Sequence, residues 1–270
     1  MGVILCSRTD PAHALLIKQL GIRVYSAEEL SYCMRKYPIL FLSGFVGEAF
    51  FHFLAYGAGE QDLAAELRIS WENGAPDEEI LMRFLEVSGC LTEEELSSFR
   101  ETAAREKSLT GVEKNVELAD LLFGLKKFGK ALKLYDAVLG AAGGATLTPR
   151  RRGLLLERKG DAYANLFLTE RAFFCYREAE ALLQEPRIRK KIYFLACMEP
   201  VIAEKQRLLE AAGGDADPVW EQEYEEAVRN AGSGPGRAEI AGIFSGDPVQ
   251  RAGKAAETIR RWKEEYRTML

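Results

Sequence analysis

The sequence has little of the residue chemistry on which most enzymes depend. His13 and His52 are the only histidines, and neither lies within metal-ligand spacing of a cysteine or of the other. No GxSxG, P-loop or HExxH motif is present. The run "GSGPG" at 232–236 follows no strand-like segment and is interrupted by Pro235, so it predicts a flexible linker rather than a phosphate loop. We expect no catalytic residue, metal or cofactor, and interpret His13 as a helix-start residue and His52 as a core histidine.

Cysteine usage and hydropathy exclude further classes. The five cysteines are odd in number, widely spread and free of any CxxC spacing, a pattern typical of buried thiols in a reducing compartment. The N-terminus "MGVILCSRTD" lacks the basic start of a signal peptide. The most apolar stretch, residues 38–59, contains Glu48 and His52, whereas a membrane span needs about 20 predominantly apolar residues. We predict a buried core helix there, and a cytoplasmic protein without membrane contact.

An overall excess of positive charge is also absent. The formal net charge of −5 and the pI near 5.4 argue against a protein whose whole surface binds nucleic acid. Residues 111–212 are an exception, with 18 lysines and arginines against 13 acidic residues between two acidic ends. Basic clusters lie at 149–152, 157–159 and 187–191. This basic middle segment has three possible interpretations: solvated helix faces, docking of the acidic ends of the same chain, or binding of an acidic partner.

The sequence predicts helix after helix. Ser26 with Glu29 and Thr92 with Glu95 have the spacing of capping boxes. Aspartates that we expect to cap helices are Asp77, Asp217 and Asp247, the last two followed by proline. Only "GVILC" and "GIRVYS", on either side of the helical pattern "PAHALLIKQL", have strand character, which predicts a small two-stranded element near the N-terminus.

A recurring spacing of small and aromatic residues identifies helical hairpins in the middle of the chain. In residues 154–168 the positions that share one helix face are Leu156, Gly160, Tyr163 and Phe167. After a turn near Thr169, a second helix presents Ala172, Tyr176, Ala179 and Leu183. Gly160 and Ala172 predict close approach of two antiparallel helices, and a neighbouring hairpin is needed to cover them.

The preceding segment repeats this frame 41 residues earlier. Ala119 takes the place of Gly160 and Leu122 that of Tyr163, and Ala131, Tyr135 and Val138 correspond to the positions of the second helix. The spacing resembles the tetratricopeptide repeat (TPR), with the surplus length assigned to a loop within "GAAGGATLTP". The resemblance covers about 112–186 well and 187–212 loosely, where a third hairpin is expected across Pro200.

The predicted fold is therefore all-α: helical hairpins stacked as a short TPR-like solenoid, with an N-terminal helical module that carries the small β element. We expect an N-terminal helical module at 1–110, TPR-like repeats at 111–212, and a linker with a C-terminal capping helix at 213–270. From Pro248 onward one apolar stripe includes Ile259, Trp262 and Tyr266. This helix either covers the open end of the repeats or pairs with a second copy in a homodimer.

The TPR resemblance implies a concave groove lined by the first helix of each repeat. The residues that it assigns to partner binding are Asp120, Phe123, Glu157, Asp161 and Asn165. Where the family's carboxylate clamp uses lysine and asparagine, this chain has Val116 with Asp120 and Glu157 with Asp161, which favours a mixed or basic peptide.

The predicted function is thus a non-catalytic protein–protein interaction adaptor or regulatory scaffold that binds a peptide or partner helix. Two alternatives remain open. One is an enzyme with an unrecognised site in the N-terminal module, around Cys6, Arg8 and His52. The other is a nucleic-acid-associated regulator that uses residues 111–212, although nucleic acid is the less favoured partner.

Overall fold

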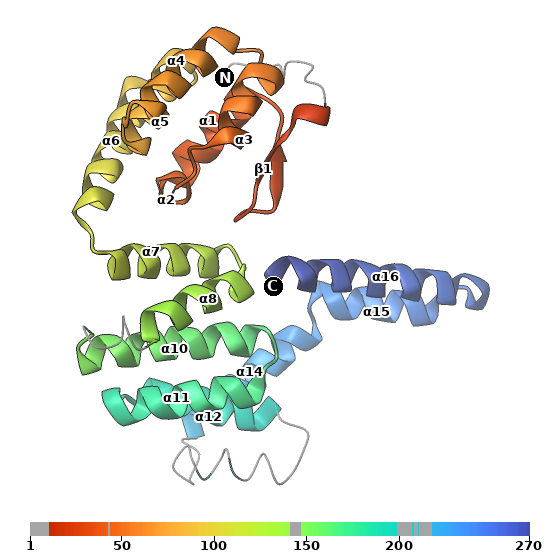
Figure 1. The fold of residues 1–270 in the computed structure, drawn as a ribbon. Helices are drawn as coiled ribbons and strands as arrows, with labels where there is room; N and C mark the ends of the chain where they lie inside the picture. Colours follow the sequence, from red (N-terminus) through yellow and green to blue (C-terminus); the bar gives the residue numbers. More distant parts are fainter. Residues whose placement is uncertain (1–10, 43, 141–146, 199–206, 208–209, 211–217) are drawn as a thin grey trace. The chain divides into compact units, whose positions relative to one another are not determined.

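The computed structural model describes residues 11–42, 44–140, 147–198, 207, 210 and 218–270. It has the expected all-α fold with one two-stranded sheet (Figure 1). The chain forms two compact units, Met1–Leu118 and Ala119–Leu270, and the division falls within one helix, α7 (Gly111–Gly124). None of the helices in the described ranges combines the length and hydropathy of a membrane-spanning helix.

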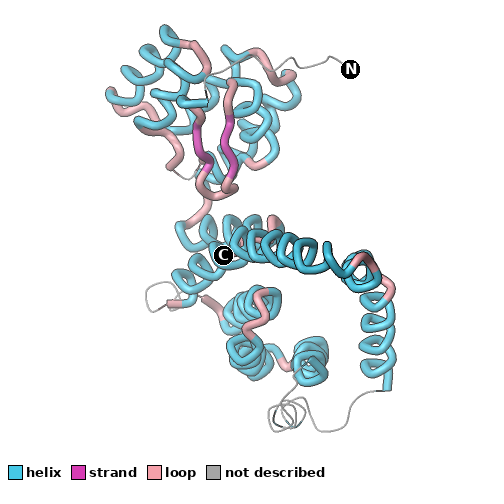
Figure 2. The backbone as a smooth tube through the Cα atoms, turned by 90° about the vertical axis from the view of Figure 1, so that its right-hand side faces the viewer, coloured by secondary structure: helices cyan, strands magenta, loops and turns pink. Residues whose placement is uncertain are grey.

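The described part of the first unit contains a β-hairpin that the sequence predicted only in part. A 3-10 turn, η1 (Pro11–His13), precedes β1 (Leu15–Ile17), which pairs antiparallel with β2 (Ile22–Val24), as Figure 2 shows. β2 confirms the strand predicted in "GIRVYS", but the predicted helix over 11–20 is wrong. Gly21 closes the connecting turn at φ 70°, so Leu15–Ile17 fold back onto β2 instead of continuing as a helix. The strand predicted in "GVILC" lies outside the described residues.

The apolar stretch at 38–59 is a core segment, but it is not one helix. It divides into α2 (Pro38–Phe41), α3 (Glu48–His52) and a π-helical turn, η2 (Phe53–Gly57). Gly44, at φ 80°, lies in the break between α2 and α3. The aromatic side chains of these pieces form much of the core, where Phe50 meets Phe84 edge to face at a centroid distance of 5.7 Å.

Four further helices precede α7 in the described part of the first unit. They are α1 (Ala27–Lys36), α4 (Gln61–Glu72), α5 (Asp77–Ser88) and α6 (Glu93–Ser108). Thr92 and Glu95 form the predicted capping box, and the Ser26 hydroxyl accepts from the Glu29 N–H at 3.3 Å. The prediction for Asp77 is wrong, because Pro76 holds the cap position and Asp77 is the first helical residue. There its carboxylate still lies at the positive end of the helix dipole.

The second unit contains two consecutive helical hairpins. The end of α7 pairs with α8 (Phe128–Leu139), and α10 (Pro149–Asn165) pairs with α11 (Thr169–Leu183). Gly160 packs against α11 as predicted, since a Cβ there would lie 2.5 Å from the Tyr176 ring. Most of the loop between the hairpins lies at 141–146, outside the described residues.

The turns of the two hairpins have the same backbone geometry. Lys126 adopts φ 59° and Phe167, 41 residues later, adopts φ 58°. The next N–H donates five residues back in each case, from Lys127 to Leu122 at 2.8 Å and from Leu168 to Tyr163 at 3.0 Å. The unit is therefore repeat-like in its backbone as well as in its residue spacing.

Helices after the second hairpin extend the unit. α12 (Pro186–Met198) packs on α11, and Trp220 of α14 (Pro218–Gly232) packs against the cluster that α11 and α12 share. The second helix predicted for a third hairpin falls largely outside the described residues, as does Asp217. The flexible linker predicted at "GSGPG" is wrong, because α14 ends at Gly232 and α15 (Pro235–Ser245) begins three residues later.

The C-terminal helix, α16 (Pro248–Met269), is capped by Asp247 as predicted, with the carboxylate accepting from the Val249 N–H at 3.0 Å. It packs along α15 and against α8, and Met269 joins an apolar cluster with Phe128 and Leu166. The helix thus docks on the chain's own hairpins. It lies against the turns of these hairpins. The helix that packs on α12, at the end of the stack, is α14.

The described cysteines are all free, but they differ in exposure. Cys33 and Cys175 are buried, Cys197 is intermediate and Cys90 is exposed. Burial raises the pKa of the Cys175 thiol to about 11. The prediction of buried thiols is confirmed for two cysteines and wrong for Cys90.

Candidate functional site

Two aspartates predicted to bind a partner are hydrogen-bonded within their own hairpins. The Tyr135 hydroxyl donates to Asp120 at 2.7 Å, and the Tyr176 hydroxyl donates to Asp161 at 2.8 Å. Burial raises the pKa of both tyrosines, and the neighbouring carboxylates raise it further. Each hairpin is therefore joined by the same hydroxyl–carboxylate bond.

Glu157, also predicted to bind a partner, is buried in an ion-pair network. Its side chain is only 5% exposed and accepts from Arg187 at 3.0 Å and from Lys191 at 2.8 Å. The Lys191 ammonium also donates to Asp161 at 2.7 Å. α12 thus supplies the cations that neutralise two carboxylates of α10, so these carboxylates no longer favour a basic peptide.

The remaining two predicted residues have different surroundings. Phe123 is half-buried, with its ring edge to face against Phe128 and the Arg158 guanidinium 5.9 Å from its centroid. Asn165 is exposed, and its side-chain amide donates to the Asp161 carbonyl at 2.8 Å. The structure therefore joins Glu157 and Asp161 through Lys191, holds Asp120 on Tyr135, and leaves Asn165 beside a groove.

The basic cluster at 187–191 is neutralised by carboxylates of the same unit. Besides the network around Glu157, Arg189 lies 4.0 Å from Glu180 and Lys190 pairs with Glu223 of α14. In the cluster at 157–159, Lys159 pairs with Asp136 at 2.7 Å. Nucleic-acid binding requires lysines and arginines that can contact the phosphates of the nucleic acid. The ion pairs within this unit reduce the number of such cations.

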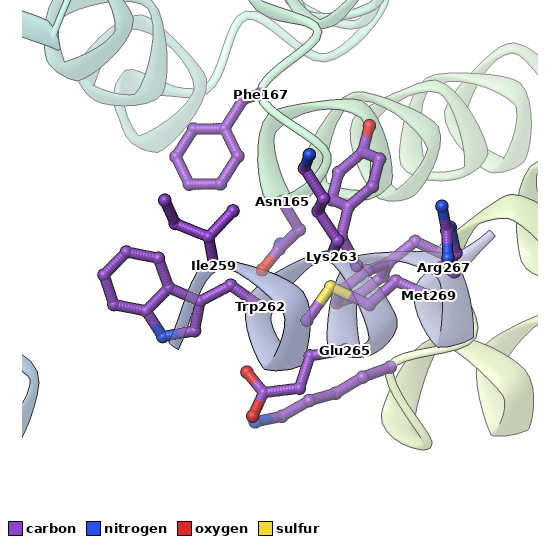
Figure 3. Close-up of a pocket in the computed structure, with 11 residues that line it drawn as sticks. Asn165, Phe167, Ile259, Trp262, Lys263, Glu265, Arg267 and Met269 are labelled. Atoms are coloured by element: carbon purple, nitrogen blue, oxygen red, sulfur yellow. The ribbon is translucent and has the colours of Figure 1, made fainter. Parts of the chain in front are cut away.

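A groove lies between α16 and the turns of the two hairpins, and Figure 3 shows the residues around it. We call it the α16 groove. It encloses about 650 Å³. Its lining residues are Lys126, Phe128, Asn165, Phe167, Ile259, Trp262, Lys263, Glu265, Tyr266, Arg267 and Met269.

The wall of the α16 groove is apolar and incompletely covered. Phe167, Ile259 and Trp262 lie beside one another in Figure 3, and their exposed fractions are 72%, 48% and 40%. Three cations, Lys126, Lys263 and Arg267, line the same groove with one carboxylate, Glu265. Its chemistry is therefore that of an apolar pocket with a positively charged border.

Phe167 occupies a backbone position that disfavours it. A residue with a Cβ pays about 1–2 kcal/mol in the left-handed region, and glycine is the usual residue there. At φ 58° the chain nevertheless has a phenylalanine whose ring is mostly in solvent. Neither backbone geometry nor burial accounts for this side chain.

Sequence reasoning identified one side of the groove and missed the other. The apolar stripe of α16 was visible from the spacing of Ile259, Trp262 and Tyr266. Phe167 was assigned to a helix face, although the frame shared with Lys126 extends to this position. Phe167 is equivalent to Lys126 in the 41-residue frame, and both positions lie beside a predicted turn. This equivalence of an apolar residue with a lysine is the signal that would have placed Phe167 in the turn.

Comparison of the chain with protein-family models, with curated proteins and with solved structures gives no significant match.

Proposed function

We propose that this protein is a non-catalytic interaction adaptor that binds a short acidic peptide in the α16 groove. The peptide carries at least one bulky apolar side chain, which enters between Phe167, Ile259 and Trp262. Its acidic residues face Lys126, Lys263 and Arg267. The observation that carries the proposal is the exposed Phe167, kept at a strained turn position and pointing toward an apolar wall.

The charge of the proposed peptide follows from which side chains are already paired. The TPR resemblance favoured a mixed or basic peptide because of Asp120, Glu157 and Asp161. Those carboxylates are bonded to tyrosine hydroxyls or to Arg187 and Lys191, whereas the groove has three cations and one carboxylate. Charge complementarity therefore supports an acidic occupant.

Aromatic anchors at the centre of an interface account for a large part of binding energy. Removing one typically costs about 2 kcal/mol or more, which is roughly a 30-fold loss of affinity. Trp262 and Phe167 are both exposed aromatic side chains of the groove. We therefore expect peptide binding to depend on both, and to weaken with added salt because of the cations at the border.

The test is selection from a displayed library of random 12-residue peptides with the intact protein as bait. Selected peptides should combine aspartate or glutamate with an aromatic residue or leucine. Fluorescence polarisation with the most enriched peptide should give affinities at least about 30-fold weaker for Trp262→Ala and Phe167→Gly. Phe174→Ala is the matched control, since Phe174 is 52% exposed on α11 but does not line the groove.

Phe167→Gly separates binding from stability. Glycine at φ 58° relieves backbone strain, so this variant should melt at or above the wild-type temperature while it loses the peptide. The proposal is overturned if selected peptides bind Phe167→Gly and Trp262→Ala as well as wild type, or if the selection enriches no acidic apolar sequences.

A further inference from the structure

The only two histidines of the chain lie side by side in the first unit. His13 ends η1 and His52 ends α3, 39 positions later, and their ring centroids are 5.4 Å apart with an interplanar angle of 44°. The Tyr56 ring is 4.9 Å from His52 and 5.9 Å from His13. The interpretation of His52 as a core histidine is wrong, because its side chain is exposed.

A π-helical turn holds this cluster together. In η2 the Ala58 N–H donates to the Phe53 carbonyl five residues back at 2.8 Å, so the helix contains an extra residue per turn. Such turns are rare in proteins, and many of those that occur lie at functional sites. This one follows His52 directly and carries Tyr56, which places the aromatic ring against both imidazoles.

Gly57 permits the approach of the two segments. A Cβ at this position would lie 2.7 Å from the His13 carbonyl oxygen and 2.6 Å from the Phe53 ring. A backbone carbonyl does not move aside as a flexible side chain does. Only a glycine therefore lets η1 lie against η2, and this contact brings His13 to His52.

From this geometry we infer that His13 and His52 form a two-histidine site for a divalent transition-metal ion such as Zn²⁺ or Ni²⁺. A metal–nitrogen bond is about 2.0–2.1 Å, so two imidazoles on one tetrahedral ion have centroids roughly 5 Å apart. The observed centroid distance of 5.4 Å is close to this separation. Imidazole nitrogens favour nickel, copper and zinc over magnesium or calcium.

The site supplies two protein ligands. Within the described ranges, no group of three or more histidine, cysteine, aspartate or glutamate side chains gathers around a possible metal position. Glu48 and Arg68 line the same surface depression as His52 and pair with each other. The other coordination positions therefore belong to water or to a donor from a bound molecule, and we expect a micromolar rather than a nanomolar dissociation constant.

The test uses untagged protein labelled with ¹⁵N only in its histidine rings and titrated with NiCl₂ or with ZnCl₂ at neutral pH. The two histidines give separate ring signals, which are assigned from the single variants His13→Gln and His52→Gln. Both signals should respond over the same concentration range with one ion per chain. In either variant the remaining histidine should need at least about tenfold more metal.

Gly57→Ala is the sharpest variant, because it keeps both imidazoles and forces their segments apart. It should weaken metal binding to the level of the single-histidine variants, while circular dichroism shows retained helix. If it does not fold, the two glutamine variants decide the question. Independent responses of the two histidines, or a response only above millimolar metal, would show ring stacking alone and overturn the inference.

Discussion

The ring of Tyr176 occupies the space next to Gly160 that a larger side chain would need. A Cβ at residue 160 would lie 2.5 Å from Cε1 and 2.6 Å from Cδ1 of that ring. Tyr176 is itself held by its hydrogen bond to Asp161, one residue after the glycine. The hydrogen bond to Asp161 therefore fixes the hydroxyl of Tyr176, and the absence of a side chain at Gly160 leaves room for its ring. Together they allow the close contact between α10 and α11.

Substitution of Gly160 by leucine should destabilise the second unit. Overpacking a filled helix contact costs about 1–3 kcal/mol, so the denaturant midpoint should fall. Gly124→Ala is the control, because a Cβ at Gly124 meets nothing within 4 Å. Because Gly124 is the last residue of α7, that change should alter stability by less than about 0.5 kcal/mol. Equal midpoints for wild type and Gly160→Leu would contradict the close contact.

The two buried tyrosines predict a loss of stability in alkali. An unfolded tyrosine ionises near pH 10, whereas the folded pKa values of Tyr135 and Tyr176 are raised by burial and by their aspartate partners. Above about pH 10 the unfolded state therefore releases protons first, and the free energy of unfolding should fall. Urea unfolding at a series of pH values from 8 to 11 measures this fall.

In the variant with both Tyr135→Phe and Tyr176→Phe, the alkaline fall should be shallower. At neutral pH this variant should be less stable by about 0.5–1.5 kcal/mol for each lost hydrogen bond. Tyr32→Phe, at an exposed position on α1, should leave both quantities close to wild type. Parallel pH curves for the double variant and wild type would refute the role of the pairs.

Sequence reasoning reached the repeat-like hairpins because their determinants are local. Close packing of two helices requires small and aromatic residues at helical spacing, and that spacing can be read from the sequence. It occurs at Gly160, Ala172 and Tyr176, and again 41 positions earlier. The capping predictions for Thr92 and Asp247 succeeded for the same reason, since a cap bonds to a backbone N–H two or three residues away.

Reasoning from local pattern failed where tertiary contacts determine the outcome. Leu15–Ile17 have a helical neighbourhood in sequence but pair with Ile22–Val24 across a glycine turn. The pairing of Glu157 with Arg187 and Lys191 spans about thirty residues, and nothing in either segment specifies the other. The approach of His13 to His52 depends on a π-helical turn that no simple periodicity predicts.

The buried carboxylate of Glu106 should be a weak point of the first unit. The residue is 3% exposed, and neither of its oxygens has a hydrogen-bond partner in the structure as described. Burial raises the pKa of Glu106. The folded state therefore binds this proton more tightly than the unfolded state, so the contribution of this group to stability improves as pH falls from neutral toward the ordinary range of glutamate.

Replacing Glu106 by methionine should raise the free energy of unfolding at neutral pH by about 1 kcal/mol, because an unpaired buried charge is removed. The gain should shrink at pH 5. Glu101→Met, on an exposed position of the same helix, serves as the control and should change stability by less than about 0.5 kcal/mol. Destabilisation by Glu106→Met at neutral pH would show that the carboxylate has a stabilising role.

Docking of α16 should depend on Gly129 in the first turn of α8. A Cβ there would lie 2.7 Å from the Leu270 Cα, which is backbone and cannot rotate away. In Gly129→Ala the end of α16 should therefore separate from α8, and amide hydrogen exchange of residues 262–269 should accelerate. Gly253→Ala, in open space on α16 itself, should not accelerate it. Unchanged exchange in Gly129→Ala would contradict this contact.

The shared turn geometry at Lys126 and Phe167 bears on how a chain of this kind changes length over evolutionary time. Ala119 and Gly160 stand at equivalent points of two helices, each one residue before the aspartate that binds a tyrosine. Excision of residues 119–159 would join Leu118 to Gly160 without altering helical phase, and a tandem duplication of the same block would preserve it equally. Gain or loss of whole 41-residue blocks leaves every hairpin with its own aspartate and tyrosine, whereas a single inserted residue in α10 would rotate Asp161 away from Tyr176 by about 100°.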